Sequence, residues 1–178
     1  MAGEDVWILG IHMTKFGKHP YKDTVDLASE AAMAALADGG VSMRDMGVLA
    51  AGNLMGAAGG IGQQLQKQIG QTGIPVFNVN NNCSTGSSAL MLGAQAVAGG
   101  LAECVLVVGF EQMEAGALQA KWTDRANPLD KFVNVMNEEQ GFNQAPPAAQ
   151  MFGGAGREYR WKYGTKKETF AKISAKAR

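Results

Sequence analysis

One long internal part of this chain carries no charge. From Gln68 to Ala102 there is no Asp, Glu, Lys or Arg, and between Leu49 and Gln68 the only charged residue is Lys67. A stretch this neutral is expected to be covered on nearly all sides, by its own domain or by a partner subunit. The whole chain is 46% hydrophobic and 18% charged, which argues against disorder and against a coiled coil.

Short apolar runs alternate with helical patterns in and around this stretch. Four runs are predicted to be strands: Val6–Ile11, Val48–Ala51, Val76–Val79 and Glu103–Phe110. Three helices are predicted between them, from Asp23 or Thr24 to Gly39, from Gly60 to Ile69, and from Ser84 to Ala98. The run at 103–110 is the clearest and is typical of a strand buried on both faces. The βαβαβαβ order predicts a layered α/β/α fold with a mainly parallel sheet.

The pattern changes after Phe110. Residues 111–147 contain three of the five prolines and many polar residues, and are predicted to be irregular. Two helices are predicted to follow. One covers Ala148–Tyr163, and the next begins with a capping box from Thr165 to Glu168 and presents Phe170, Ile173 and Ala177 on one face.

Composition excludes several functional classes. Lys and Arg together number 16, as do Asp and Glu, so a globally basic nucleic-acid binder is not indicated. No run of about 18 apolar residues predicts a membrane span. The two cysteines make no disulfide scaffold and no signal peptide is visible, so we expect an intracellular, cytoplasmic setting. His12 and His19 lack partners at ligand spacing, so no metal site is predicted.

Cys83 is the candidate nucleophile. It joins a predicted strand to a predicted helix made of small residues, where free N–H groups and the helix dipole favour thiolate over thiol. Its backbone N–H could donate to an oxyanion on an attached acyl group. The alternative is that Cys83 is simply a small buried residue. Cys104 lies inside an apolar strand pattern and is predicted to be a core residue.

A glycine pattern suggests a second enzyme class. Residues 56–62, GAAGGIG, follow a predicted strand as in short-chain dehydrogenases, and Asn80-Asn81 and a Tyr163/Lys167 pair have the residue types of the rest of that motif. However, Gly164 separates Tyr163 from Lys167, which must share one helical face in that family. No acidic ribose-binding residue follows the glycines, so a nicotinamide-dependent dehydrogenase is disfavoured.

The longest motif is NVNNNCSTGSSAL at 78–90, followed by GGLAECVLVVGFEQM at 99–113. Together they resemble the nucleophile segment of thiolases, above all the sterol-carrier-protein type. Further matching stretches run from the first predicted strand to the last helix: GIHMTKFGK, DLASEAAMAALADGG, KWTDR, AQMFGGAG and KYGTKKETFAKI. The resemblance therefore covers essentially the whole chain.

This resemblance implies acyl transfer to or from coenzyme A, in degradation or synthesis of fatty acids or steroids. Cys83 matches the cysteine that takes the acyl group as a thioester, and its N–H matches one oxyanion donor. Met151 matches a methionine of the acyl pocket, or else is ordinary core. A coenzyme A thioester is the implied substrate, with no bound cofactor. The basic tail after Arg157 either attracts the phosphates of coenzyme A or is a solvated helix face.

The resemblance also divides the chain. Residues 1–111 match the N-terminal α/β domain without its last strand, and 112–178 match part of a mainly helical loop domain. In the family, the segment corresponding to 76–98 lies at a tight dimer interface, which would account for the uncharged stretch.

The second half of a thiolase, with the histidine that activates the cysteine, has no counterpart here. Three explanations stay open: a fragment of a longer protein, one subunit of a split thiolase whose partner chain supplies that half, or a non-catalytic thiolase-like protein that binds acyl-CoA. Some sterol-type relatives are retro-aldolases of steroid side chains that pair with an OB-fold protein, so this activity is also an alternative. A peroxisomal location is open if the protein is eukaryotic.

Overall fold

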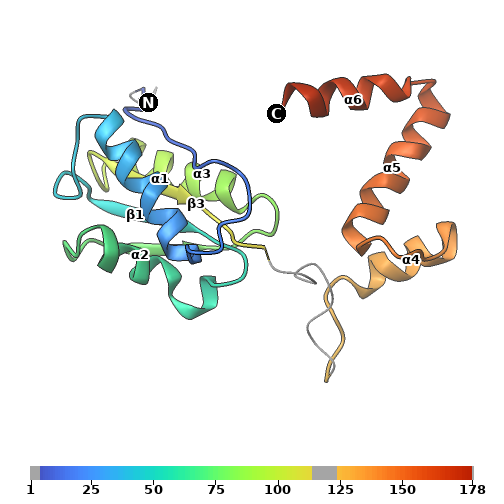
Figure 1. The fold of residues 1–178 in the computed structure, drawn as a ribbon, viewed down its shortest axis with the longest axis horizontal. Helices are drawn as coiled ribbons and strands as arrows, with labels where there is room; N and C mark the ends of the chain where they lie inside the picture. The colour runs from blue at the N-terminus through green and yellow to red at the C-terminus, as the bar shows by residue number, and fades with distance from the viewer. Residues whose placement is uncertain (1–4, 114–123, 178) are drawn as a thin grey trace. The chain divides into compact units, whose positions relative to one another are not determined.

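The computed structural model describes residues 5–113 and 124–177 (Figure 1). The chain divides into two compact units, residues 1–112 and 113–178, and each is described by itself. The assignment of 1–111 and 112–178 to a thiolase domain and a loop domain stays a prediction.

The first unit is built on three parallel strands in the order β2-β1-β3. These are β1 (Val48–Gly52), β2 (Val76–Val79) and β3 (Val105–Gly109), and the predicted parallel α/β fold is confirmed. All five residues of β1 are buried because a strand lies on each side and a helix layer on each face. In β3, Leu106 and Val108 are buried and Val105 and Val107 are partly buried, so the expected burial on both faces is complete on one face and partial on the other.

Helices cover both faces of this sheet. One face packs on α1 (Thr24–Asp38) and α2 (Ile61–Ile69), and its core contains Leu36, Leu65 and Leu106. The other face packs on α3 (Thr85–Ala98). A short 3₁₀ turn, Ala57–Gly59, lies between β1 and α2. The helix bounds agree with the predicted ones to within a residue or two because capping residues and glycines mark their ends.

Glycines let α3 lie close to the sheet. A Cβ on Gly93 would lie 2.6 Å from Val107 Cγ2 on β3, and a Cβ on Gly109 would lie 3.2 Å from Gly86 Cα. The first distance is shorter than real Cβ contacts and the second is tighter than most of them. The small residues of α3 thus fix the distance between this helix and the strand beneath it.

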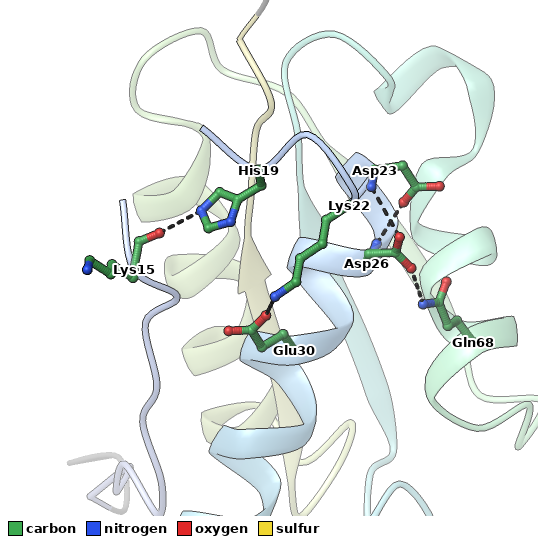
Figure 2. A network of polar contacts seen from close by, with 7 residues as sticks. All are labelled: Lys15, His19, Lys22, Asp23, Asp26, Glu30 and Gln68. Atoms are coloured by element: carbon green, nitrogen blue, oxygen red, sulfur yellow. Dashed lines mark hydrogen bonds and ion pairs between the residues drawn. The ribbon is translucent and has the colours of Figure 1, made fainter. Parts of the chain in front are cut away.

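The start of α1 is tied to α2 by the contacts in Figure 2. Asp23, one of the two predicted capping residues, is the N-cap, and it also forms a capping box with Asp26. Gln68 Nε2 on α2 donates to Asp26 Oδ1 at 2.8 Å. This bond, with the backbone bond to Asp23, lowers the pKa of the Asp26 carboxyl.

The segment before α1 is attached in the same region. Lys22 forms an ion pair with Glu30 on α1, which lowers the pKa of the Glu30 carboxyl. His19 Nε2 donates to Lys15 O at 2.8 Å, so the loop bonds to itself as well as to the helix (Figure 2).

The predicted first strand is wrong. Val6–Ile11 forms no strand and pairs with none of the described strands. Instead Ile11 N donates to Asp38 Oδ2 at 2.9 Å, and a Cβ on Gly10 would collide with Ala35 O and Gly39 N. This segment therefore lies along the C-terminal end of α1, and the sheet has three strands rather than four.

The second unit contains three helices among its described residues: α4 (Asp130–Gln140), α5 (Pro147–Tyr163) and α6 (Lys167–Lys176). Its mainly helical character is confirmed, and buried Gln150 ties α5 to the preceding loop by donating to Asn143 O at 3.1 Å. Part of the predicted irregular segment 111–147, residues 114–123, lies outside the described residues, as does most of KWTDR.

Two predictions for the second unit are wrong. Residues 130–140 are helical although Pro128 lies nearby, because a proline before the first turn removes no helical hydrogen bond. The capping box at Thr165 does not form: α6 begins at Lys167, one residue later than that box requires, and its N-cap Lys166 makes no side-chain cap.

The uncharged stretch is only partly covered by this chain. Large apolar side chains on β2, on α3 and after α3 are exposed, at 41% for Phe77, 52% for Leu90, 59% for Met91 and 64% for Leu101. Coverage of this face by a partner subunit stays a prediction. None of the helices in the described residues is both long and apolar enough to cross a bilayer.

Candidate functional site

Cys83 lies at the edge of the sheet where the strands end. The strand β2 stops at Val79, residues 80–84 turn, and α3 starts at Thr85 with Ser84 as its N-cap. Cys83 precedes that N-cap and is exposed. The predicted position before the helix is confirmed, and the alternative of a small buried residue is wrong within this chain.

The turn that carries Cys83 is fixed by Thr85, which is 6% exposed. The Thr85 hydroxyl donates to Asn82 O at 2.6 Å and accepts from Asn81 N at 2.8 Å. Asn82 has φ 49°, the left-handed region, which Asn tolerates better than most residues. The backbone of the two residues that precede Cys83 is therefore held by the buried side chain of a residue that follows it.

Asparagines attach this turn to its neighbours. Asn81 Nδ2 donates to Ser88 Oγ on α3 at 2.9 Å. Asn80 Nδ2 donates to Leu54 O at 3.1 Å, and Asn80 Oδ1 accepts from Asn82 N at 3.2 Å. Asn80 thus bonds the Cys83 turn to the loop that follows β1.

That loop is fixed in turn by two side chains from the strand ends. Asn53 is 1% exposed, and its Nδ2 donates to Phe110 O at 2.8 Å. Glu111 Oε2 accepts from Leu54 N at 3.0 Å and from Met55 N at 3.2 Å. The ends of β1, β2 and β3 are therefore joined by one continuous set of hydrogen bonds.

The Cys83 thiol makes no hydrogen bond with any of the described residues. It is thus an accessible sulfur at a helix N-terminus, where N–H groups favour negative charge. Cys104 differs: it packs against the core, and burial raises the pKa of its thiol. Its prediction as a core residue is borne out by partial burial rather than full burial.

The chain is similar along nearly its whole length to one protein family. The profile described as "Thiolase, N-terminal domain" matches residues 6–177, nearly the whole chain. The chain belongs to the thiolase N-terminal domain family. The resemblance to thiolases drawn from residues 78–113 is confirmed.

Curated relatives of this thiolase-family chain cover it almost completely. "Sterol carrier protein 2" of Oryctolagus cuniculus is 47% identical over 174 residues, which is 96% of this chain and 32% of that protein. "Non-specific lipid-transfer protein-like 2" of Caenorhabditis elegans is 44% identical, over 96% of this chain and 43% of that protein. An "Acetyl-CoA acetyltransferase" of Methanothermobacter thermautotrophicus is 29% identical, over 96% of this chain and 43% of that protein. The chain thus spans about a third to two fifths of the length of these relatives.

Met151, the second predicted site residue, lies on α5 in the second unit and is half-buried. Its role in the site of this thiolase-family chain stays a prediction.

The dehydrogenase motif does not assemble. Tyr163 is the last residue of α5, Gly164 turns the backbone at φ 65°, and Lys167 is the first residue of α6. Tyr163 and Lys167 thus belong to two helices and share no helical face. The glycines at 56–62 form a 3₁₀ turn and the start of α2.

A shallow apolar groove lies elsewhere in the first unit. It is lined by the C-terminal half of α1 and the loops before β1 and β2, and includes Met33, Val41, Arg44 and Ile69. Those loops precede the strands, so the groove is at the opposite edge of the sheet from Cys83. It has no place in the Cys83 site.

Sequence reasoning missed Asn53, Thr85 and Glu111. The available signal was weak: a polar residue one or two positions past each of two apolar strands, and a Thr two residues after the cysteine. Only the strand order, which places β1 beside β3, brings Asn53 and Glu111 together.

Proposed function

We propose that this chain binds a lipid acyl-CoA thioester at the edge of the sheet formed by the strand ends, with the acyl carbonyl beside Cys83. The observation that carries this proposal is the exposed Cys83, placed directly before the N-cap of α3 on a turn fixed by Thr85. Helix N-termini attract anions and developing negative charge, such as that on a thioester oxygen.

The names of the relatives support lipid binding first. The relative matched at 47% identity is called a sterol carrier protein, and the one matched at 44% is called a lipid-transfer protein. Binding requires an accessible surface and does not require a base. A binding role for this chain is therefore the more economical proposal.

Acyl transfer is the second candidate, and the accessible thiol favours it. The Cys83 sulfur would attack the thioester carbonyl, the bond from that carbon to the coenzyme A sulfur would break, and the thiol proton would end on the released coenzyme A. The acyl group would then be a thioester on Cys83. A relative named acetyl-CoA acetyltransferase at 29% identity supports this class of reaction.

Such a transfer needs a base, and the described residues bring none into hydrogen-bonding contact with Cys83. We infer that a second half supplies it, either in a longer chain or in a partner chain. A dimer formed through 76–98, with the exposed Phe77, Leu90 and Met91, belongs to the same proposal. A steroid-side-chain retro-aldolase paired with an OB-fold protein stays an alternative that does not need the thiol.

The test combines binding with intact mass. The protein, with every chain that co-purifies, is titrated with a long-chain acyl-CoA, and the mass of each chain is then measured. A dissociation constant without a mass increase supports binding alone, whereas an added acyl group on Cys83 supports transfer. Cys104→Ser is the matched control, because it removes the other thiol while leaving the proposed site intact.

Cys83→Ala separates the remaining outcomes. It should abolish the acyl adduct and keep acyl-CoA binding within about tenfold, since a thiol contributes little to binding by itself. Survival of steroid cleavage in Cys83→Ala would support the retro-aldolase. Absence of acyl-CoA binding in the wild-type protein would refute both binding and transfer.

A further inference from the structure

We propose that Glu111 is a positioning residue for Cys83, acting through the loop after β1 and through Asn80. This inference rests on the proposed function only in its choice of Cys83 as the reactive group. The geometry that supports it is a chain of hydrogen bonds that begins at the Glu111 carboxylate and ends one residue before Cys83.

The first link is the carboxylate itself. Glu111 Oε2 accepts from two consecutive backbone N–H groups, Leu54 N at 3.0 Å and Met55 N at 3.2 Å. Its other oxygen, Oε1, accepts from Gln112 N at 3.3 Å and lies 3.5 Å from Asn53 Nδ2. A carboxylate that accepts several N–H bonds holds its donors more firmly than a neutral group does. Glu111 therefore fixes the loop after β1.

The next links cross from β1 to β2. Leu54, whose N–H is held by Glu111, has its carbonyl oxygen bonded by Asn80 Nδ2 at 3.1 Å. The same Asn80 side chain accepts from Asn82 N at 3.2 Å through its oxygen. Because one amide group makes both bonds, a shift of the loop moves Asn80 and then Asn82, the residue before Cys83.

Glu111 is well anchored for this role. Phe110 N donates to Gly52 O at 3.0 Å, which continues the pairing of β3 with β1 up to the residue before Glu111. On the other side, Gln112 Nε2 donates to Lys22 O at 2.9 Å, and Gln112 Oε1 accepts from Thr24 Oγ1 at 3.1 Å. The residues on either side of Glu111 are thus attached to the sheet and to the start of α1, so the carboxylate is held from both directions.

This series of hydrogen bonds ends at Asn82, which has φ 49°, a left-handed conformation that Asn tolerates and that the surrounding bonds hold in place. Thr85 enforces it from below, through Asn82 O, and Asn80 enforces it from the side, through Asn82 N. Loss of the side contact leaves the Cys83 backbone restrained on one side only, which is sufficient to move a reacting atom by a fraction of an ångström.

The experiment compares two carboxylates that each cap a turn. Glu111→Ala removes the proposed positioning residue, and Glu111→Gln keeps one acceptor oxygen. Asp45→Asn is the matched control: Asp45 Oδ2 accepts from Ser42 N and Ser42 Oγ, both at 2.8 Å, in the loop before β1 at the opposite edge of the sheet. A general loss of stability should affect both carboxylates, whereas positioning of Cys83 should depend on Glu111 alone.

Two measurements are made on the protein with all co-purifying chains. The first is hydrogen exchange at the Asn82 amide, which Glu111 does not touch. Glu111→Ala should speed it at least tenfold, Glu111→Gln by less, and Asp45→Asn not at all. The second is alkylation of Cys83 by bromoacetyl-CoA relative to iodoacetamide, followed by site-resolved mass. This ratio should fall about 10- to 100-fold in Glu111→Ala, because small misplacements of reacting groups cost factors of this size.

The outcomes keep the two proposals apart. If wild-type Cys83 shows no preference for bromoacetyl-CoA, the acyl-CoA proposal fails, and the exchange of Asn82 still tests Glu111. If Asn82 exchange is the same in Glu111→Ala as in the wild type, the positioning role is refuted. Should Glu111→Ala fail to fold, Glu111→Gln and Asn80→Ala carry the same test. Together these two substitutions should have less than additive effects, since both interrupt one chain of bonds.

Discussion

Gly93 sets the distance between the helix that follows Cys83 and the sheet, and replacing it by alanine should test this packing. A Cβ at position 93 would lie 2.6 Å from Val107 Cγ2 and 3.3 Å from Val105 Cγ1. Favourable carbon–carbon contacts are about 3.5–4.0 Å, so the new methyl intrudes by roughly 1 Å. Val107 is β-branched and has few rotamers with which to withdraw.

The magnitude follows from two opposing terms. Overpacking a close interior contact costs about 1–3 kcal/mol. Alanine in place of glycine inside a helix raises the free energy of unfolding by about 0.5–1 kcal/mol. The net expectation for Gly93→Ala is a loss of about 0–2.5 kcal/mol in the free energy of unfolding, against a gain of about 0.5–1 kcal/mol where an added Cβ meets no clash. Gly86→Ala, in the same helix, is the control, because a Cβ there has Gly109 Cα as its nearest neighbour at 4.0 Å.

The assay is urea unfolding of the wild type and both variants, followed by circular dichroism. Gly93→Ala should lower the midpoint, and Gly86→Ala should leave it unchanged or raise it. Adding Val107→Ala removes the clashing methyls, so the double variant with Gly93→Ala should lose less than the sum of the two single changes. If Gly93→Ala is as stable as Gly86→Ala, the close packing of α3 on β3 is not what requires glycine at position 93.

Two further perturbations have defined signs. Thr85→Val keeps the side-chain shape but removes the hydroxyl that is bonded to Asn82 O and Asn81 N. It should lower the free energy of unfolding, measured in urea, by about 1–3 kcal/mol, whereas Thr85→Ser should lower it much less. Equal stability of the two variants would contradict the role of the hydroxyl. The Asp26 pKa is lowered in the fold, chiefly by Gln68, so its contribution to stability is present above the ordinary value of 3.8 and is lost as the pH falls through the lower folded value. Gln68→Ala should therefore raise the Asp26 pKa toward 3.8, as followed by NMR titration, and an unchanged titration would refute the assignment.

Local patterns were sufficient for much of the first unit. Glycine pairs at 39–40 and 99–100 and the Asp23 cap mark helix ends through backbone chemistry that does not depend on the rest of the fold. The position of Cys83 before α3 is local in the same sense, because it depends only on where β2 ends and α3 begins. This is why the candidate nucleophile was found from the sequence.

The side chains that hold the backbone around Cys83 could not be predicted from local sequence patterns. Asn53 and Glu111 are 58 residues apart in sequence and meet only because β1 pairs with β3 in the register Gly52↔Gly109. A βαβ pattern indicates parallel strands, but it does not decide which strands are neighbours. Asn53 and Glu111, which support the site, can therefore be identified only when the strand order is known. Cys83 can be identified from the local sequence pattern alone.

The wrong strand prediction at Val6–Ile11 shows that an apolar run can indicate a tendency toward burial without indicating a strand. An apolar run predicts that its side chains tend to leave water, while a strand also requires a neighbouring backbone to accept its hydrogen bonds. In the described chain, Trp7 and Ile8 are 77% and 73% exposed, and the segment pairs with no strand. The exposed apolar side chains of α3 pose the same question, since Leu90 and Met91 belong to the stretch without charge. In both places the sequence indicates that the residues favour burial, and the identity of what buries them depends on contacts that the local pattern does not encode.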